Sequence, residues 1–270
     1  MRISTKPSIN LLTLSYGWNK TKLLDKYKEK GHFSLFLLEA ISRSALPKFE
    51  YQGKKHPLQE NKSWYGAFER DMKEVYRIFS TEIVHASKNN SFAEAKRFKP
   101  QLEYLLKSFG AYKTNVKAVI LSPNWFGIEG EGYGPLIDGI AYAIFTPSKK
   151  TNQTWLMVHE TCHSFLLQTM KSKKVKSLIK DTEPLLYSWS TKKFRQYYPK
   201  WEWVIEEYLI HAIEQRVTDS SVASKKAAGM NRVDWFIKSW QFFQETRSQQ
   251  DSVEDWIVQT LMQLKSKIKR

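Results

Sequence analysis

Apolar residues recur at helical spacing over most of the chain. Between positions 64 and 84, Phe68, Met72 and Val75 lie three or four residues apart, which places them on one face of a helix. Gly110 follows a similar pattern and is a natural place for a helix to end. The pattern predicts helices over 34–41, 64–84, 101–109, 155–170, 201–217, 233–245 and 253–268.

Two short segments in the middle of the chain are typical of strands. The run 116–121 is apolar and rich in β-branched residues, and the run 139–145 is similar; both end at a proline-containing turn. A glycine-rich segment, 127–135, lies between them and is expected to be a lid or a simple turn. This order predicts an α+β fold that is mostly helical, with a small β-sheet preceding a buried helix.

The chain is expected to form a single domain over residues 1–270. No linker rich in Pro, Gly or Ser interrupts it, and it contains no internal repeat. A chain of this length can bury a sizeable core without dividing. We therefore expect a helical N-terminal part at 1–110, a core at 111–220 and a helical C-terminal part at 221–270.

Composition narrows the class of protein. Hydrophobic residues make up 41% of the sequence, which excludes global disorder, and no run approaches the roughly 20 apolar residues of a transmembrane helix. The N-terminal residues lack the apolar core of a secretory signal, which slightly favours the cytoplasm. The single cysteine, Cys162, excludes a cysteine-based zinc cage, so any metal site must use His and carboxylates.

The net charge of +16 is unevenly distributed. Residues 161–200 carry nine Lys and Arg against two acids, whereas 201–220 carry five acids against one Arg. The simplest interpretation is a basic, solvated exterior around a site that is not itself basic. Attraction to nucleic acid, an anionic membrane or an acidic substrate is the alternative, and nucleic acid is not the expected partner.

The run His159-Glu160-Thr161-Cys162-His163 carries the clearest chemistry. A spacing of four residues places both imidazoles on one helix face, where they can share a metal ion. Catalytic zinc takes three protein ligands and leaves one position for water. Glu160 can reach that water as a general base. The alternative is a core in which these three side chains satisfy one another, while Cys162 is expected to be a small buried hydrophobe.

The helix predicted at 201–217 is the best source of a third ligand. Glu206 and Glu207 are adjacent acids in an apolar context, where acids are rarely placed without a partner. They point about 100° apart, so only one can face a metal. Glu207 is favoured because His211 lies one turn further along the same face, although Glu206 stays open. His211 is expected to hydrogen-bond a ligand or a developing oxyanion.

Other segments and residues could contribute to a site, but each also has a simpler structural interpretation. The strand at 139–145 is either an edge strand that pairs with an extended peptide or an ordinary sheet strand. Tyr133, Tyr142 and Tyr208 are possible oxyanion donors, but core packing is the more common role for any one of 13 tyrosines.

The motif and the later glutamate resemble the gluzincin group of zinc metallopeptidases. More narrowly, Gly132-Tyr133-Gly134-Pro135, the strand, the motif and Glu207-x-x-x-His211 are similar to a bacterial zincin-like family of unknown function. The similarity covers roughly residues 115 to 220. It implies one Zn²⁺ per chain held by His159, His163 and Glu207, with Glu160 and His211 as catalytic groups.

The resemblance implies a zinc-dependent hydrolase that cleaves a peptide or protein substrate. Two features depart from the group: Glu207 follows His163 by 44 positions, and His211 stands where many gluzincins hold an acid. An amide in a cell-wall or small-molecule substrate is also compatible with the motif. The alternative is a binding function without catalysis: an inactive zincin-fold protein that binds a partner or polyanion through its basic surface.

Overall fold

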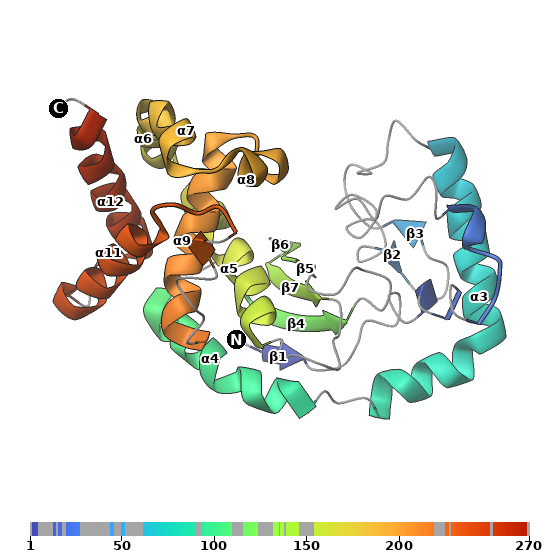
Figure 1. Cartoon of the computed structure of the whole chain (residues 1–270). Coiled ribbons are helices and arrows are strands. Elements are labelled where there is room, and N and C mark those ends of the chain that lie inside the picture. The colour runs from blue at the N-terminus through green and yellow to red at the C-terminus, as the bar shows by residue number, and fades with distance from the viewer. Residues whose placement is uncertain are drawn as a thin grey trace. The chain divides into compact units, whose positions relative to one another are not determined.

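The structure is a computed structural model, and Figure 1 shows its fold. It describes residues 2–4, 13–14, 16–17, 20–27, 44–45, 50–51, 62–89, 93–109, 116–123, 132–134, 136–137, 139–145, 154–218, 225–226, 228–248 and 251–268. The helices are η1 (Asp25–Tyr27), α3 (Lys62–Asn89), α4 (Ala93–Phe109), α5 (Thr154–Met170), α6 (Lys173–Thr182), η3 (Glu183–Leu185), α7 (Leu186–Trp189), α8 (Lys192–Tyr197), α9 (Trp201–Thr218), α11 (Val233–Thr246) and α12 (Val253–Ile268). The strands are β1 (Arg2–Ser4), β2 (Ser44–Ala45), β3 (Glu50–Tyr51), β4 (Ala118–Pro123), β5 (Gly132–Tyr133), β6 (Leu136–Ile137) and β7 (Ile140–Phe145).

The expectation of a mostly helical α+β fold is confirmed. Six of the predicted helices appear as α3, α4, α5, α9, α11 and α12, and both predicted strands appear as β4 and β7. The helix expected at 34–41 lies outside the described residues. The strands β1, β2 and β3 were missed because two or three residues are too few to show a period. Among the described residues, no helix has the length and apolarity that crossing a bilayer requires.

The sheet precedes α5, as predicted, but has more strands than the expected pair. Its order is β1-β4-β7-β5, and β6 also pairs with β7. β1, β4 and β7 are parallel, whereas β5 and β6 run antiparallel to β7. β7 therefore has partners on both sides, so it is an ordinary interior strand and not the edge strand that the sequence left open.

The described chain divides into two compact units. One comprises residues 1–96 and 116–160, and the other comprises 97–115 and 161–270. The boundary falls between Glu160 and Thr161, inside α5, so this helix belongs to both units. These limits differ from the three parts expected from the sequence, because the chain of the second unit includes most of α4, where Phe109 packs on Phe165 at 5.1 Å.

The core of the first unit combines α3 with residues from early in the chain and from the sheet. Phe68, Met72 and Val75 are completely or almost completely buried, as their helical spacing predicts, and Ile144 of β7 belongs to the same cluster. Tyr133 and Tyr142 pack against this cluster. Their rings therefore contribute to packing, which is the simpler of their two interpretations.

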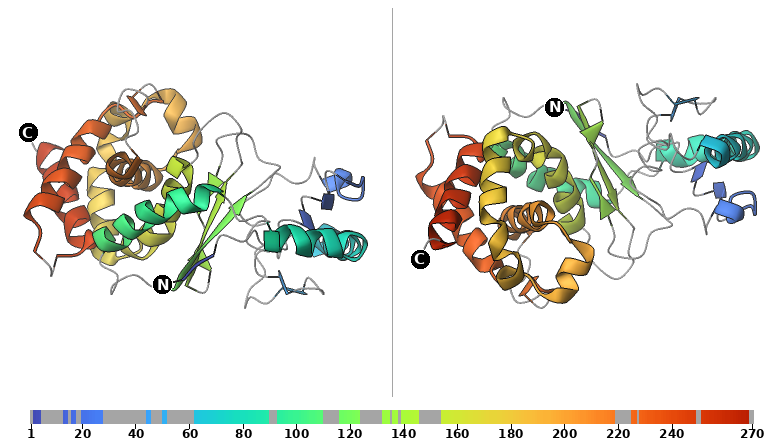
Figure 2. Two further views of the ribbon diagram at one scale, coloured as in Figure 1. Left: turned by 90° about the horizontal axis from the view of Figure 1, so that it is seen from below. Right: turned by 90° about the horizontal axis from the view of Figure 1, so that it is seen from above.

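The second unit is built around α9. Figure 2 shows this helix among the other helices of the unit; α11 and α6 pack against it, and α12 packs against both of them. Its buried residues lie on all sides of the helix, which is typical of a helix enclosed by others. The neighbouring helices α11 and α12 meet through Trp240 and Trp256, whose ring centroids are 4.5 Å apart. Any charged side chain on the inner positions of α9 is therefore held in a largely apolar setting.

Candidate metal centre

Helix α5 carries His159 and Glu160 in a buried position. These residues are 7% and 5% exposed, and most of the other residues of the helix are also buried. Trp155, one turn before His159, presents its ring edge to the imidazole at a centroid distance of 6.4 Å. Cys162 is completely buried, which confirms the expectation of a small core residue.

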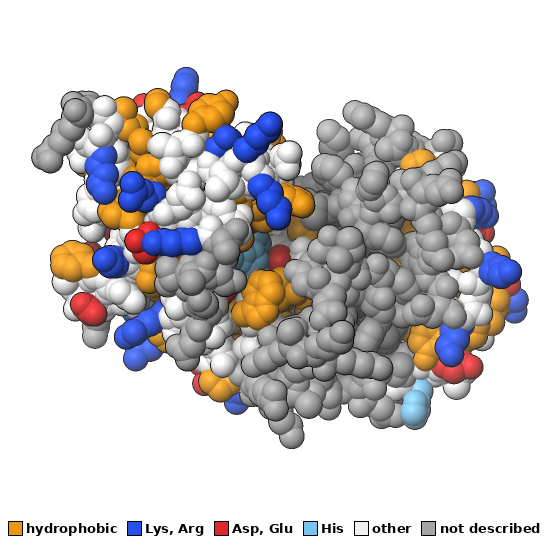
Figure 3. Space-filling model, viewed as in Figure 1, with side chains coloured by type: hydrophobic (Ala, Val, Ile, Leu, Met, Phe, Trp, Pro, Cys, Tyr) orange, Lys and Arg blue, Asp and Glu red, His pale blue; other side chains and the backbone are white. Residues whose placement is uncertain are grey.

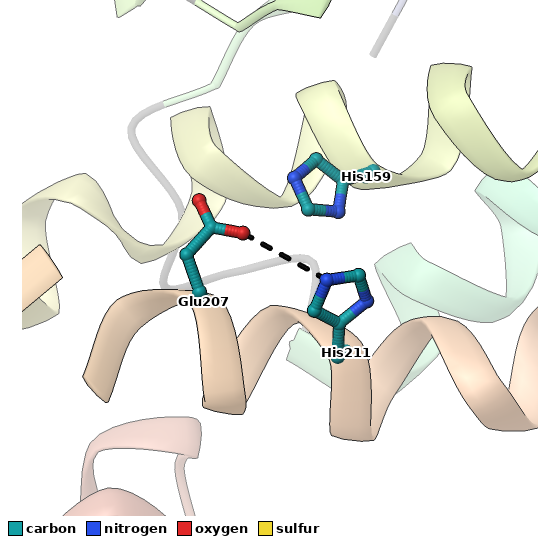
Figure 4. A group of neighbouring side chains, drawn as sticks. All are labelled: His159, Glu207 and His211. Carbon is teal, nitrogen blue, oxygen red and sulfur yellow. Dashed lines mark ion pairs between the residues drawn. The ribbon is translucent and has the colours of Figure 1, made fainter. Parts of the chain in front are cut away.

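Glu207 and His211 lie one turn apart on α9, and Figure 4 shows them facing His159 of α5. One ligand atom from each of these three side chains lies within 4.8 Å of the others. Glu207 is only 4% exposed, so its carboxylate is almost completely removed from water. The three residues offer two imidazole nitrogens and a carboxylate oxygen at one point.

His163 contacts the same carboxylate from the next turn of α5. Its Nε2 lies 3.5 Å from Oε1 of Glu207, while its Nδ1 lies 2.9 Å from Oε1 of Glu206. The two adjacent acids thus have different neighbours. Glu207 belongs to the group with His159, and Glu206 lies beside the outer nitrogen of His163. This arrangement favours Glu207 over Glu206 as the candidate ligand.

His211 occupies the other side of Glu207. Its Nε2 lies 3.8 Å from Oε2 of Glu207, and its Nδ1 lies 3.0 Å from Oε2 of Glu214. Nζ of Lys225 is 2.8 Å from the same Nδ1 and 2.8 Å from Oε1 of Glu214. The ligands expected from the sequence were His159, His163 and Glu207; in the structure His211, expected to be catalytic, joins His159 and Glu207.

Glu214 and Lys225 were not among the residues predicted for the site. Glu214 lies seven positions after Glu207, hence on the same face of the helix, and its place in an apolar stretch was a usable signal. Lys225 carried no comparable signal, because it lies in a lysine-containing segment beyond α9 that resembles ordinary surface sequence.

The donor set fits zinc. Imidazole nitrogen and carboxylate oxygen are among its usual ligands, and the buried glutamate supplies a negative charge that a cation would compensate. Three imidazoles surround the carboxylate of Glu207, so two histidines could join it in a three-ligand site. His159 is one, and either His163 or His211 is the other.

Two glycines of the segment expected to be a lid or turn lie directly against Glu160. An added Cβ at Gly132 would be 2.5 Å from Oε1 of Glu160. At Gly134 an added Cβ would overlap the main-chain oxygen of Glu160. Only glycine permits the backbone to approach so closely, so these positions help to set the place of the Glu160 carboxylate.

Gly134→Ala is expected to destabilise the protein by about 1–3 kcal/mol, because the methyl group has no space beside a helix backbone that cannot move independently. Urea unfolding measures the change. The matched control is Gly66→Ala in α3, where the added carbon meets only the end of Arg70 at 3.9 Å. That substitution is expected to stabilise by about 0.5–1 kcal/mol. A neutral result for Gly134→Ala would contradict the close approach.

Tyr208 does not face the candidate centre as an oxyanion donor. Its side chain is completely buried, its hydroxyl donates to the main-chain oxygen of Trp189, and it accepts from the main-chain N–H of Arg232 at 3.4 Å. Burial raises the pKa of the Tyr208 hydroxyl well above its usual value. The residue is a core tyrosine that ties α9 to the end of α7 and to the start of α11.

Comparison with known proteins adds no relative. No family model matches the sequence, and no match was found among curated proteins or among solved structures.

Proposed function

We propose that this chain is a zinc-dependent hydrolase of the zincin type that cleaves a peptide or a similar acyl bond. The observation that supports the proposal is the group of His159, Glu207 and His211, of which the first two are buried and His211 is partly buried, with Glu160 adjacent to His159. Buried ionisable side chains that converge on one point are costly unless a partner compensates them. A divalent cation is such a partner.

The metal would be held by His159, Glu207 and one further histidine. When bound at such a site, zinc polarises a substrate carbonyl and lowers the pKa of water. Glu206 would orient His163 through its Nδ1, and the pair of Glu214 and Lys225 would orient His211 in the same way.

Glu160 would move the proton. It directly follows His159 on α5, and it is the one acid of that helix. Its carboxylate accepts the proton of the attacking water and returns it to the leaving nitrogen, which is general base and then general acid catalysis. The backbone at Gly132 packs closely beside this carboxylate, and that at Gly134 packs against the main chain of Glu160. Because Glu160 is almost completely buried, its carboxylate is screened from bulk water.

Metal analysis tests the proposal. The purified chain is expected to bind about one Zn²⁺ per molecule, and His159→Ala or Glu207→Ala is expected to lower the affinity more than about 100-fold, beyond the 10–100-fold typical of residues outside the ligand shell. The matched control is His85→Ala, which removes an exposed histidine from α3 and should leave binding unchanged. A wild-type chain that binds no zinc at micromolar free Zn²⁺ would contradict the proposal.

The alternative, a partner or polyanion bound through the basic surface, rests on the charge of the segment 161–200. Apart from Arg195, every Lys and Arg in that segment is exposed. Figure 3 shows such side chains scattered over the helices of the second unit on the face drawn. Scattered cations are also what an ordinary solvated exterior presents, so the buried group supports catalysis more specifically. Absence of zinc binding would favour this alternative.

A further inference from the structure

Two imidazoles flank the carboxylate of Glu207, and their outer nitrogens have different neighbours. His163 directs Nε2 toward one oxygen of Glu207, and His211 directs Nε2 toward the other. Nδ1 of His163 lies 2.9 Å from the carboxylate of Glu206. Nδ1 of His211 lies 2.8 Å from the amine of Lys225.

The neighbour of Nδ1 decides what Nε2 can do. In a neutral imidazole one ring nitrogen carries the proton and the other has a lone pair. Both ring nitrogens of His163 face carboxylates, which only accept, but Glu206 is within hydrogen-bond distance of Nδ1 at 2.9 Å, whereas Glu207 is 3.5 Å from Nε2. In the neutral ring Nδ1 therefore donates to Glu206, which leaves the lone pair on Nε2. A metal needs that lone pair. His163 is therefore prepared to be a ligand on the side that faces Glu207.

Lys225 prepares His211 for the opposite role. An ammonium group has three donors and no acceptor, so its contact with Nδ1 requires Nδ1 to be the acceptor. The proton of the neutral imidazole then resides on Nε2. His211 thus presents an N–H group toward Glu207 and can donate a hydrogen bond, but it has no lone pair there for a metal.

Glu214 is the group that would favour the other tautomer. Its Oε2 lies 3.0 Å from Nδ1 of His211, and it could accept a proton from it. However, Lys225 lies closer to that nitrogen and also bonds Oε1 of Glu214 at 2.8 Å. The ammonium of Lys225 therefore compensates the charge of Glu214, and at the same time it donates a hydrogen bond to Nδ1 of His211.

The position of Lys225 is held by the turn that follows it. The main-chain oxygen of Lys225 accepts from Met230, and the main chain of Gly229 and Asn231 is bonded to Thr191 and Trp189. Gly229 has a φ of 106°, a conformation that glycine adopts readily. The side chain of Lys225 is only 6% exposed. Burying a charged lysine costs folding free energy unless a strong partner compensates its charge.

We propose that Lys225 is a positioning residue that holds the proton of His211 on Nε2, so that His163 completes the metal site with His159 and Glu207 while His211 acts as a hydrogen-bond donor. The inference rests on the proposed function for the identity of the metal. The tautomer itself does not depend on it. The tautomers identify His163 as the second histidine ligand, a choice that distance alone left open. Glu206 keeps the proton of His163 on Nδ1, whereas Lys225 keeps that of His211 on Nε2.

The tautomers are measured directly by nitrogen NMR of the full chain, free of metal and labelled with ¹⁵N-histidine. The His211 and His163 signals are identified from their loss in His211→Gln and His163→Gln. We expect the proton of His211 on Nε2 and that of His163 on Nδ1. A proton on Nδ1 of His211 would overturn the proposal. Because no metal is present, this result is independent of whether the chain binds zinc.

Lys225→Met tests the cause. With the ammonium removed, Nδ1 of His211 is expected to donate to Glu214, so the tautomer should invert in the same spectrum. The matched control is Lys226→Met, which removes the adjacent, half-exposed lysine that pairs with Asp234 at 3.2 Å. The control should keep the wild-type tautomer. An unchanged tautomer in folded Lys225→Met would overturn the role of Lys225, and the wild-type spectrum remains decisive if that variant does not fold.

Zinc titration separates the two histidines. His163→Gln is expected to weaken Zn²⁺ binding more than about 100-fold, since it removes a ligand, whereas the loss in His211→Gln should stay within the roughly 10–100-fold typical of residues outside the ligand shell. The reverse order would overturn the assignment. Failure of every form, including the wild type, to bind zinc would instead contradict the proposed function and leave the NMR result standing.

Discussion

Glu160→Gln is expected to lower the rate of hydrolysis about 10²–10⁴-fold while zinc binding stays intact, because the amide cannot accept the proton of the attacking water. Glutamine has nearly the same shape, so the buried space beside Gly132 and Gly134 remains filled. The measurements are kcat/KM on a fluorescence-quenched peptide mixture and the zinc content of the same preparation.

The matched control for this variant is Glu183→Gln, which makes the same chemical change at an exposed position of η3. Its activity and zinc content should equal those of the parent. If Glu160→Gln cleaves as fast as the parent, Glu160 is not the base. If it loses zinc together with activity, Glu160 contributes to the metal site instead, and the assignment of the motif must change.

Glu214→Gln is expected to lower the free energy of unfolding by about 3–5 kcal/mol. The side chains of Glu214 and Lys225 are 1% and 6% exposed, and their charged atoms are 2.8 Å apart. Removing one charge leaves the other buried without compensation, and in a largely apolar setting that penalty exceeds the attraction that was lost. Urea unfolding followed by fluorescence measures the change.

A surface ion pair supplies the control for burial. Lys265 and Asp181 approach within 2.7 Å, but their side chains are 40% and 37% exposed. Asp181→Asn should therefore change the free energy of unfolding by no more than about 1 kcal/mol. Combining Glu214→Gln with Lys225→Met should recover part of the loss, since no buried charge then remains. Equal effects at the two sites would contradict the argument from burial.

The long helices could be predicted because their patterns are long. α5 and α9 begin and end within about a residue of the predicted ranges, since a run of 17 or 18 residues shows its apolar character clearly. β1 could not be predicted, because its three residues depend on pairing with β4, more than a hundred positions away. The helices α6, α7 and α8 were not predicted, because ten residues or fewer show too little of a helical period.

The candidate site divides in a similar way. The spacing of His159, Glu160 and His163 shows that they share one stretch of helix, and this depends only on helical geometry. Helical spacing to His211 already favoured Glu207 over Glu206 but left Glu206 open, and the different neighbours of the two acids in the structure agree with that preference. The place of His211 beside Glu207 follows from helical spacing, but the neighbours of its Nδ1 do not.

The sequence alone was therefore enough to predict the long helices, the order of strands and helices, and the motif on α5. These properties depend on residues that are close in sequence. Only the tertiary structure shows that Lys225 contacts His211 and that Glu206 contacts His163. Each contact joins residues that are distant in sequence, and no helical or strand periodicity relates them. The physical reason is that a hydrogen bond requires the donor–acceptor distance to lie within a few tenths of an ångström of its best value. Only packing sets such distances, and they decide which imidazole can hold a metal.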